Sequence, residues 1–277
     1  MLSTASPRRC TIAIAGIETG AGSPGVSLAH ALRGAEGIQE RLIGLAAERD
    51  VPKLRAADLG LWSVVAAPAP AEGESFLERL REIHERSPID VLLATRTPDV
   101  EALSGAEAEL RLMGIHTFLA TPGQVEYLRS AGSGRDAAGS GHRVEAEYAV
   151  AAVGDGHGGL AGVVALRKIK ADGESQRWVG VAARDDLLRQ TVHAFVEAPR
   201  LRGPLDLDVA RTGSGPYQVI RAEPRLPGWV HLFVPSGPNL PWAVVRLALG
   251  EVLEPQRELP GGPLLVGGAW EAWMARS

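Results

Sequence analysis

The 277-residue chain has a single cysteine, Cys10, and only three lysines, at Lys53, Lys168 and Lys170. One cysteine excludes an intramolecular disulfide and a cysteine-rich metal site, and it is compatible with a reducing compartment. The lysine count excludes a P-loop, because none of the three lysines stands in a G-x-x-x-x-G-K-[ST] sequence. Any mechanism that needs a lysine therefore has three candidates.

Other short signatures are also absent. The sequence contains no H-E-x-x-H, no C-x-x-C and no G-x-S-x-G, which excludes the zinc, redox and serine-hydrolase sites that depend on them. The net charge of -4 comes from interleaved acids and bases, so there is no basic face for nucleic acid. No apolar segment of signal-peptide or membrane-spanning length is present. We therefore expect a cytoplasmic protein without a membrane or nucleic-acid partner.

The first half of the chain alternates between strand and helix patterns. Short apolar runs predict strands at residues 11–16, 41–46, 62–67, 89–95 and 115–120. Helix patterns lie between them: one begins at Pro24, one spans residues 76–86 with Ser75 as its cap, and one runs from about Pro98 to Met113. This alternation predicts an α/β domain over residues 1–130, with a doubly wound, Rossmann-like parallel sheet.

The pattern changes after residue 130. Residues 131–143 are rich in glycine, serine and alanine without apolar periodicity, which predicts a flexible linker. Beyond it, strand patterns at 147–154, 160–170, 204–211 and 217–223 are joined by turns typical of antiparallel pairs, and helices are predicted at 184–198 and 238–251. Residues 144–277 should therefore form a second, α+β domain.

The first strand-to-helix turn contains the spacing G-x-G-x-x-G at Gly20, Gly22 and Gly25. This spacing is typical of dinucleotide-binding turns, where the helix N-terminus faces a pyrophosphate. Two neighbours oppose that interpretation: Pro24 removes a backbone donor, and Glu18 adds a negative charge. The same turn also occurs where backbone passes close to a helix N-terminus, with or without an anion.

Three acids in the second half share one face of its predicted sheet. Asp206 and Asp208 alternate along one strand, and Glu223 ends the next strand. Their oxygens suit a divalent cation. A solvated acidic face explains the same pattern equally well, and the residues alone do not decide between the two.

The segment YQVIRAEPRLPGWVHLFVPSGPNLPWAVVRLALGE resembles the C-terminal core of the ATP-grasp superfamily. The group concerned is the carboxylate-amine ligases related to the large subunit of carbamoyl phosphate synthetase. The resemblance rests on Pro224-Arg225, on Gly237 with Asn239-Leu240-Pro241, and on Leu249-Gly250-Glu251. The first half resembles the domain that precedes the ATP-grasp fold in that group.

For an active ligase the resemblance implies ATP and Mg²⁺ as cofactors. In that case Lys168 or Lys170 would contact the phosphates, although both lie beyond the segment that carries the family's phosphate lysines, and Arg225 and Asn239 would belong to the catalytic machinery. Asp206, Asp208 and Glu223 would then be the metal ligands.

The sequence departs from that family at two places. The family has several tens of residues, forming a lid over ATP, where this chain has only the dozen residues AGSGRDAAGSGH, too few to fold as a subdomain. The family's E-x-N-P-R is replaced by R-A-E-P-R, which puts Arg221 at the metal-bridging position. We expect Arg221 to repel Mg²⁺ and to pair with Glu223 or Asp208.

These departures predict a degenerate ATP-grasp-like protein: a pseudoenzyme without a cofactor, acting as a binding or scaffold subunit in a peptide or amino-acid ligase pathway. Its partner would be a full-length relative, another pathway enzyme or a second copy of the chain. Loss of the lid would expose an apolar face, to which Trp178, Trp229 and Trp242 are candidate contributors. The first alternative is a reduced but active ATP-dependent ligase, and the second is a dinucleotide-binding protein.

Overall fold

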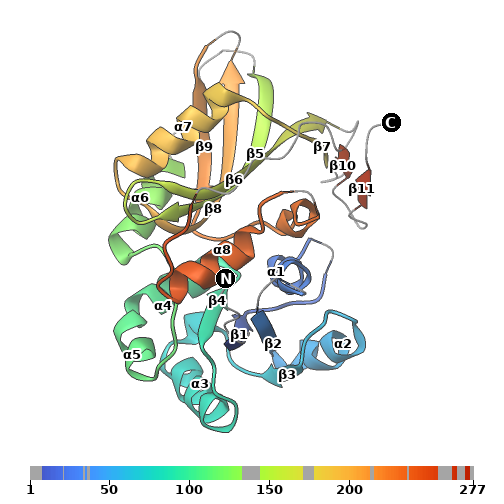
Figure 1. Cartoon of the computed structure of the whole chain (residues 1–277), viewed down its shortest axis with the longest axis vertical. Coiled ribbons are helices and arrows are strands. Elements are labelled where there is room, and N and C mark those ends of the chain that lie inside the picture. The colour runs from blue at the N-terminus through green and yellow to red at the C-terminus, as the bar shows by residue number, and fades with distance from the viewer. Residues whose placement is uncertain are drawn as a thin grey trace, which may run out of the picture.

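The computed structural model describes residues 8–20, 22–33, 35, 38–132, 144–170, 178–212, 215–235, 237–254, 264–266 and 272–274. A parallel sheet and an antiparallel sheet lie in separate halves of the molecule, with helix α8 (Leu240–Ala248) between them (Figure 1). Both predicted sheet types are therefore present. Among the described helices, none is long and apolar enough to cross a bilayer.

The first sheet has four parallel strands in the order β3-β2-β1-β4. They are β1 (Arg8–Ala15), β2 (Ile38–Ala46), β3 (Ser63–Ala66) and β4 (Val91–Ala94). Side chains of the central strand β1 alternate between two apolar clusters, with Ile12 and Ile14 in one and Ala13 and Ala15 in the other. Burial on both faces explains why these strands have continuous apolar sequences.

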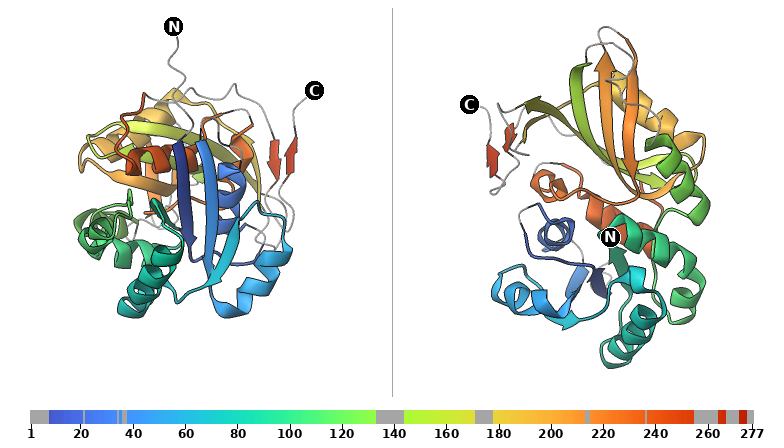
Figure 2. Two further views of the ribbon diagram at one scale, coloured as in Figure 1. Left: turned by 60° about the horizontal axis from the view of Figure 1, so that its bottom comes forward. Right: turned by 180° about the vertical axis from the view of Figure 1, so that it is seen from behind.

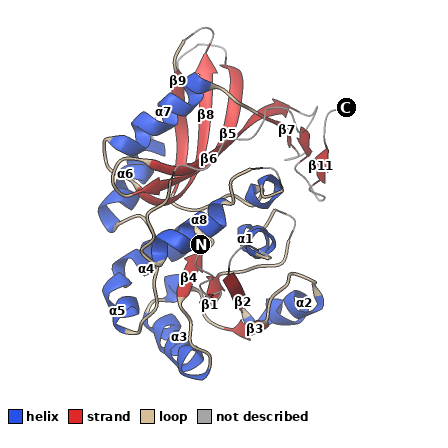
Figure 3. Ribbon diagram, in the orientation of Figure 1, coloured by secondary structure: helices blue, strands red, loops and turns tan. Residues whose placement is uncertain are grey.

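Helices cover both faces of this sheet (Figure 3). They are α1 (Pro24–Leu32), α2 (Val51–Ala56), α3 (Glu74–Arg86), α4 (Thr97–Gly105), α5 (Glu107–Leu112) and α6 (Pro122–Gly132), with 3₁₀ turns η1 (Glu48–Asp50) and η2 (Pro70–Glu72). Leu28 and Leu32 of α1 pack on the Ile12 side, whereas Phe76 and Leu80 of α3 belong to the opposite cluster. The arrangement is the predicted doubly wound one.

The second sheet has seven strands in the order β11-β10-β7-β6-β5-β8-β9, and its paired neighbours are antiparallel. Its strands are β5 (Val144–Asp155), β6 (Leu160–Lys170), β7 (Trp178–Ala182), β8 (Arg202–Thr212), β9 (Tyr217–Glu223), β10 (Leu264–Val266) and β11 (Ala272–Met274). Figure 2 shows this sheet from behind, above the parallel sheet. The strands β7, β10 and β11 had no counterpart in the sequence prediction.

Both faces of the antiparallel sheet are covered. Helix α7 (Asp186–Glu197) contributes Leu188, Val192 and Val196 to the cluster on one face, and η3 (Val230–Phe233) and α8 pack on the other. Trp229 is buried against Phe233, and Trp242 is packed against the same core. These two tryptophans are therefore core residues, whereas the side chain of Trp178 lies outside the described part of the chain.

Two predicted helix features are wrong. The helix expected from about Pro98 to Met113 is divided into α4 and α5 at Gly105–Ala106, where the N–H of Ala106 bonds to two carbonyls and glycine weakens the helix. Ser75 is not a cap, because its hydroxyl donates to Glu72 O within the turn. The cap is Gly73, whose positive φ of 65° is a glycine conformation.

The strand expected at residues 115–120 is also wrong. This segment makes one isolated parallel bridge to the first sheet, between His116 and Val91. Its later residues lie against β8, where a Cβ on Gly203 would come within 2.9 Å of Phe118 O. Contact with the second sheet therefore replaces pairing with β4. Of the predicted linker 131–143, the first two residues end α6, and 133–143 lie outside the described residues.

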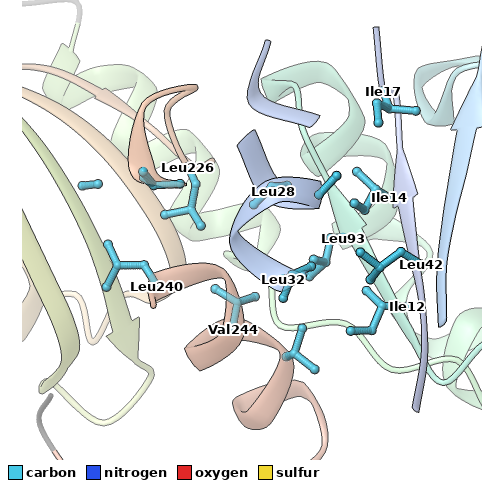
Figure 4. Packing of buried hydrophobic residues seen from close by; sticks show 14 of the residues in the cluster. Ile12, Ile14, Ile17, Leu28, Leu32, Leu42, Leu93, Leu226, Leu240 and Val244 are labelled. Atoms are coloured by element: carbon cyan, nitrogen blue, oxygen red, sulfur yellow. The ribbon is translucent and has the colours of Figure 1, made fainter. Parts of the chain in front are cut away.

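The two halves of the molecule are joined through α1, α8 and the segment before η3. Figure 4 shows Leu28 and Leu32 of α1 between the β1 side chains and Val244 of α8. On the same helix, Ser27 Oγ accepts the backbone N–H of His231 and is hydrogen-bonded to His231 Nδ1 at 2.8 Å. Burial, followed by the charge of neighbouring His30, lowers the pKa of His231 to about 4, so the ring is neutral at pH 7.

The tightest contact of this junction is between two glycines. A Cβ on Gly228 would collide with the backbone carbonyl of Gly22, so only glycine fits at this point. We predict that Gly228→Ala lowers the free energy of unfolding by about 1–3 kcal/mol, because the added methyl forces the loop and the second half apart.

Urea denaturation measures this effect, and Gly123→Ala is the matched control. A Cβ on Gly123 meets nothing within 4 Å, so its substitution should change stability by less than about 0.5 kcal/mol. Equal stabilities for the two variants would contradict the packing described.

Candidate functional site

The three predicted acidic residues do lie together, and strand pairing brings them there. Asp206 and Asp208 point to the same face of β8, and β9 runs antiparallel beside it. The register places Glu223 opposite Asp206 and Arg221 opposite Asp208. Directly opposed side chains interact across a sheet, so this register alone brings three carboxylates and one guanidinium together.

Arg221 contacts all three acids. Its Nε donates to Asp208 Oδ2 at 2.7 Å, its Nη1 donates to Glu223 Oε1 at 2.5 Å, and its Nη2 lies 3.4 Å from Asp206 Oδ1. The predicted pairing of Arg221 with Glu223 or Asp208 is confirmed, and both pairs form. The planar guanidinium suits this role because its donors spread in a fixed fork.

Two further cations complete the group. Arg225 Nε donates to Glu223 Oε2 at 2.6 Å, and its Nη2 lies 3.0 Å from Asp206 Oδ2. Lys168 Nζ lies 2.6 Å from Asp208 Oδ1. We call Lys168, Asp206, Asp208, Arg221, Glu223 and Arg225 the ion-pair cluster. Its three carboxylates are balanced by three cations.

Burial and charge act in opposite directions on the acids. Burial raises the pKa of Asp206 to about 6, against the attraction of Arg225 and Arg221. Asp206 is only 3% exposed, so desolvation dominates there. Burial would also raise the pKa of Asp208 and of Glu223, but hydrogen bonds and charges from the neighbouring cations hold both below their ordinary values.

Arg221 responds to the acids in turn. Burial alone would lower its pKa, but the attraction of Asp206, Asp208 and Glu223 outweighs this and raises the pKa above the ordinary arginine value. The guanidinium therefore stays charged at any pH at which the protein is folded.

The cluster does not fit Mg²⁺ as it stands. Each carboxylate already has a cationic partner at 3.0 Å or less, so a divalent ion would have to displace a guanidinium or an ammonium. Within the described residues there is no group of three or more histidine, cysteine, aspartate or glutamate side chains arranged to hold a metal. A metal role for Asp206, Asp208 and Glu223 stays a prediction of the ligase alternative.

A cavity of about 640 Å³ lies beside the ion-pair cluster, between the two halves of the chain. Arg221, Glu223 and Arg225 line it from the second half, and Arg96 and Arg129 line it from the first. Thr97 Oγ1 donates to Glu223 Oε2 at 3.3 Å, so the start of α4 is tied to the cluster. We call this cavity the front cleft.

The remaining predicted residues are spread over the structure. Asn239 caps α8: its Oδ1 accepts the N–H of Trp242 at 3.0 Å, and its Nδ2 donates to Ala31 O at 2.6 Å. Both ends of this amide therefore bond to backbone. Lys170 ends β6, and its side chain lies outside the described part of the chain.

The predicted glycine loop does form the strand-to-helix turn between β1 and α1. Gly22 has a positive φ of 74°, and a Cβ on Gly25 would approach Ile17 to 2.9 Å. These glycines are thus required by the turn itself and by close packing. Gly228 covers the loop at Gly22, on the side of the second half.

Sequence reasoning missed Arg96 and its partners. The Arg96 guanidinium holds the fully buried Asp99 through two bonds, at 2.7 and 3.0 Å, and reaches Glu18 Oε1 at 3.0 Å. The signal was the R-T-P-D sequence after β4, in which an arginine and an aspartate are separated by one helical turn. Arg96 also lines a second cavity of about 540 Å³ at the carboxyl ends of β1, β2 and β3.

Comparison with solved structures identifies similar folds. A biotin carboxylase domain of a single-chain bacterial carboxylase matches with a TM-score of 0.58 and 15% identity, over 93% of this chain and 73% of its own. An L-amino acid ligase from Bacillus licheniformis matches with a TM-score of 0.56 and 12% identity, over 94% and 79%. Glycinamide-RNase-transformylase T from Mycobacterium tuberculosis matches with a TM-score of 0.57 and 14% identity, over 94% and 84%.

No family model matches the sequence, and no curated protein matches it either. The matched structures are ATP-grasp enzymes, so the resemblance stated from the sequence is confirmed at the level of the fold. At identities of 12–15% the likeness concerns the fold alone.

The ion-pair cluster predicts a specific stability effect. We expect Arg221→Gln to lower the free energy of unfolding at pH 7 by about 2–3 kcal/mol, because three carboxylates lose a shared partner. This is less than for a fully buried pair, because the Arg221 side chain is 38% exposed. The cost should begin to shrink as the pH falls through 6, where Asp206 is protonated, and should shrink further below pH 5, because Asp208 and Glu223, whose pKa values are lowered, stabilise the fold only while they are ionised.

Denaturant unfolding at each pH measures this cost. Arg81→Gln is the control, because it removes a surface pair with Glu109 in which both side chains are about half exposed. Such a pair contributes less than about 1 kcal/mol. Equal costs for the two variants would contradict the cooperative cluster.

Proposed function

We propose that this chain is a non-catalytic binding subunit with an ATP-grasp fold, whose front cleft receives a ligand or a partner segment without phosphorylating it. The observation that carries the proposal is the ion-pair cluster, in which Arg221, Arg225 and Lys168 neutralise the acids at the predicted metal position. The chain would then have retained the cleft of a ligase but not its phosphoryl-transfer activity.

The chemistry of carboxylate activation supports this proposal. Transfer of a phosphoryl group to a carboxylate requires cations that are free to bind the phosphate oxygens, and a site that excludes water. Here Lys168 is bound to Asp208, and both Arg221 and Arg225 are bound to acids. A nucleotide would have to break these pairs in order to gain the same cations.

The short connection between α6 and β5 supports it as well. Only eleven residues, 133–143, connect α6 with β5, and a segment of that length has no core of its own. The matched enzymes are longer than this chain, which covers 73% of the biotin carboxylase domain and 79% of the L-amino acid ligase.

The ligand and partner are inferred by analogy. The L-amino acid ligase suggests an amino acid or a peptide as the ligand of the front cleft. The partner would be a full-length ATP-grasp relative, another enzyme of the same pathway, or a second copy of the chain. A dinucleotide is disfavoured, because Gly228 packs on Gly22 of the turn to which a pyrophosphate would bind.

The direct test is a titration with labelled ATP in the presence of Mg²⁺, with a thermal-shift series that includes NAD. A ligand that binds the native state raises the unfolding midpoint by mass action. We expect neither nucleotide to shift the midpoint and labelled ATP to show no saturable binding.

Micromolar ATP binding would overturn the proposal. In that case Asp206→Asn and Glu223→Gln distinguish a reduced ligase from adventitious binding, because only a ligase would lose ATP turnover with these acids. An NAD-dependent shift would instead support the dinucleotide alternative.

A further inference from the structure

A separate cavity of about 440 Å³ lies near the opposite end of β4 from the front cleft. Strand β4 runs from Val91 to Ala94, and residues after its carboxyl end line the front cleft. The opposite cavity is lined by His116, which bridges to Val91 at the start of the strand. We call it the rear cavity.

Both halves of the chain contribute to the rear cavity. Glu107 and residues 115–118 belong to the first half, whereas the turn at residues 155–157 and Arg202 at the start of β8 belong to the second. The end of α8 completes the lining. A ligand bound here would therefore contact both halves at once.

Two donors in this lining are buried without a partner. Thr117 is 8% exposed, and its hydroxyl makes no hydrogen bond to any described residue. The Nε of Arg202 is also buried and unpaired within the described part of the chain. Polar groups buried in this way are costly unless a ligand or water satisfies them.

The acids of the rear cavity are already engaged. Glu107 binds Arg202 at 2.8 Å and Arg111 at 3.4 Å. Asp155 Oδ1 accepts the backbone N–H groups of His157 at 2.7 Å and of Gly159 at 2.9 Å. Glu107 is therefore paired with cations, whereas Asp155 is held by backbone N–H groups of the turn.

The imidazoles of His116 and His157 line the same space. Neither ring forms a hydrogen bond or an ion pair with another residue of the described ranges. With Arg202 and Thr117 they form a set of imidazole, guanidinium and hydroxyl groups, all of which can donate to oxygen. Metal-binding groups of three or more acidic, histidine or cysteine side chains are absent from the described ranges.

We propose that the rear cavity binds a small oxyanion, namely inorganic phosphate or a phosphate monoester, through the unpaired Nε–H of Arg202, the Thr117 hydroxyl and the rings of His116 and His157. The two Nη groups of Arg202 stay bound to Glu107, so no ion pair has to break. A guanidinium N–H forms a strong, charge-assisted bond to a phosphate oxygen, and imidazole N–H and hydroxyl groups add further donors. The bound anion would accept hydrogen bonds from both halves of the chain: from His116 and Thr117 in the first half and from His157 in the turn between β5 and β6. This site is independent of the front cleft and of the function proposed for it.

Inorganic phosphate is the probe for this site. Isothermal titration calorimetry of the full chain measures its affinity, and thermal unfolding is followed with sodium chloride at matched ionic strength as the comparison. We expect saturable binding and a midpoint that rises with phosphate but not with chloride. A phosphate monoester is the second arm, which distinguishes the free ion from a phosphorylated metabolite by relative affinity.

Two variants test the residues. His157→Gln changes an exposed turn position, and Thr117→Val keeps the shape while removing the hydroxyl. Each should weaken phosphate binding by about fivefold or more. If Thr117→Val does not fold, His157→Gln still decides the outcome. Two controls should bind phosphate normally: His193→Gln, an exposed histidine on α7, and Arg129→Gln, in the front cleft.

The proposal is overturned if phosphate and chloride act alike, or if His157→Gln binds phosphate as tightly as the unmodified chain. Loss of binding in Arg129→Gln would place the anion in the front cleft and would also overturn it. None of these outcomes bears on ATP binding, so the two proposals fail separately.

Discussion

The guanidinium of Arg221 holds three carboxylates together on one face of the antiparallel sheet. Arg221 stands opposite Asp208 across β8 and β9 and contacts three carboxylates that the fold brings to one face of the sheet. Without a cation, three acids in such proximity would repel one another and resist burial. Arg221, with Arg225 and Lys168, supplies within the chain the positive charge that a metal ion would otherwise supply.

The permanent charge of Arg221 has a structural consequence. A bound Mg²⁺ can exchange, and it can bridge to a phosphate, whereas a guanidinium is covalently part of β9 and saturates the same oxygens permanently. The cluster also reaches the first half, because Glu223 accepts a hydrogen bond from Thr97 at the start of α4. Glu223 therefore helps to hold the two halves together.

An apolar junction also joins the two halves, and it explains how the chain stays folded with so short a connection between α6 and β5. Apolar residues of β1, α1, α8, β5 and β6 form one continuous cluster, so the sheets share a core. Helix α8 has apolar side chains on both sides, and Val244 and Val245 are buried in this cluster. The backbones of Gly228 and Gly22 pack directly against each other, at a point where there is no room for a side chain on Gly228.

The periodic features of the sequence predicted much of this architecture. Alternation placed Asp206 and Asp208 on one face, because that argument needs only local spacing. The ion pair of Arg221 was predicted from the resemblance to the ATP-grasp family, in which a glutamate stands at that position. The path of residues 115–120 depends on contacts with distant strands, which local propensity does not describe. The meeting of Lys168 with Asp208, the bidentate Arg96–Asp99 pair and the rear cavity likewise arise from residues far apart in the chain.

The claim that arginine has replaced the metal is tested most directly by titrating the unmodified protein with Mn²⁺ and following the EPR signal of the free ion. The account predicts that the free-ion signal is undiminished by the protein, with or without ATP. A stoichiometric loss of that signal, reversed by excess Mg²⁺ and abolished in Asp206→Asn, would contradict it.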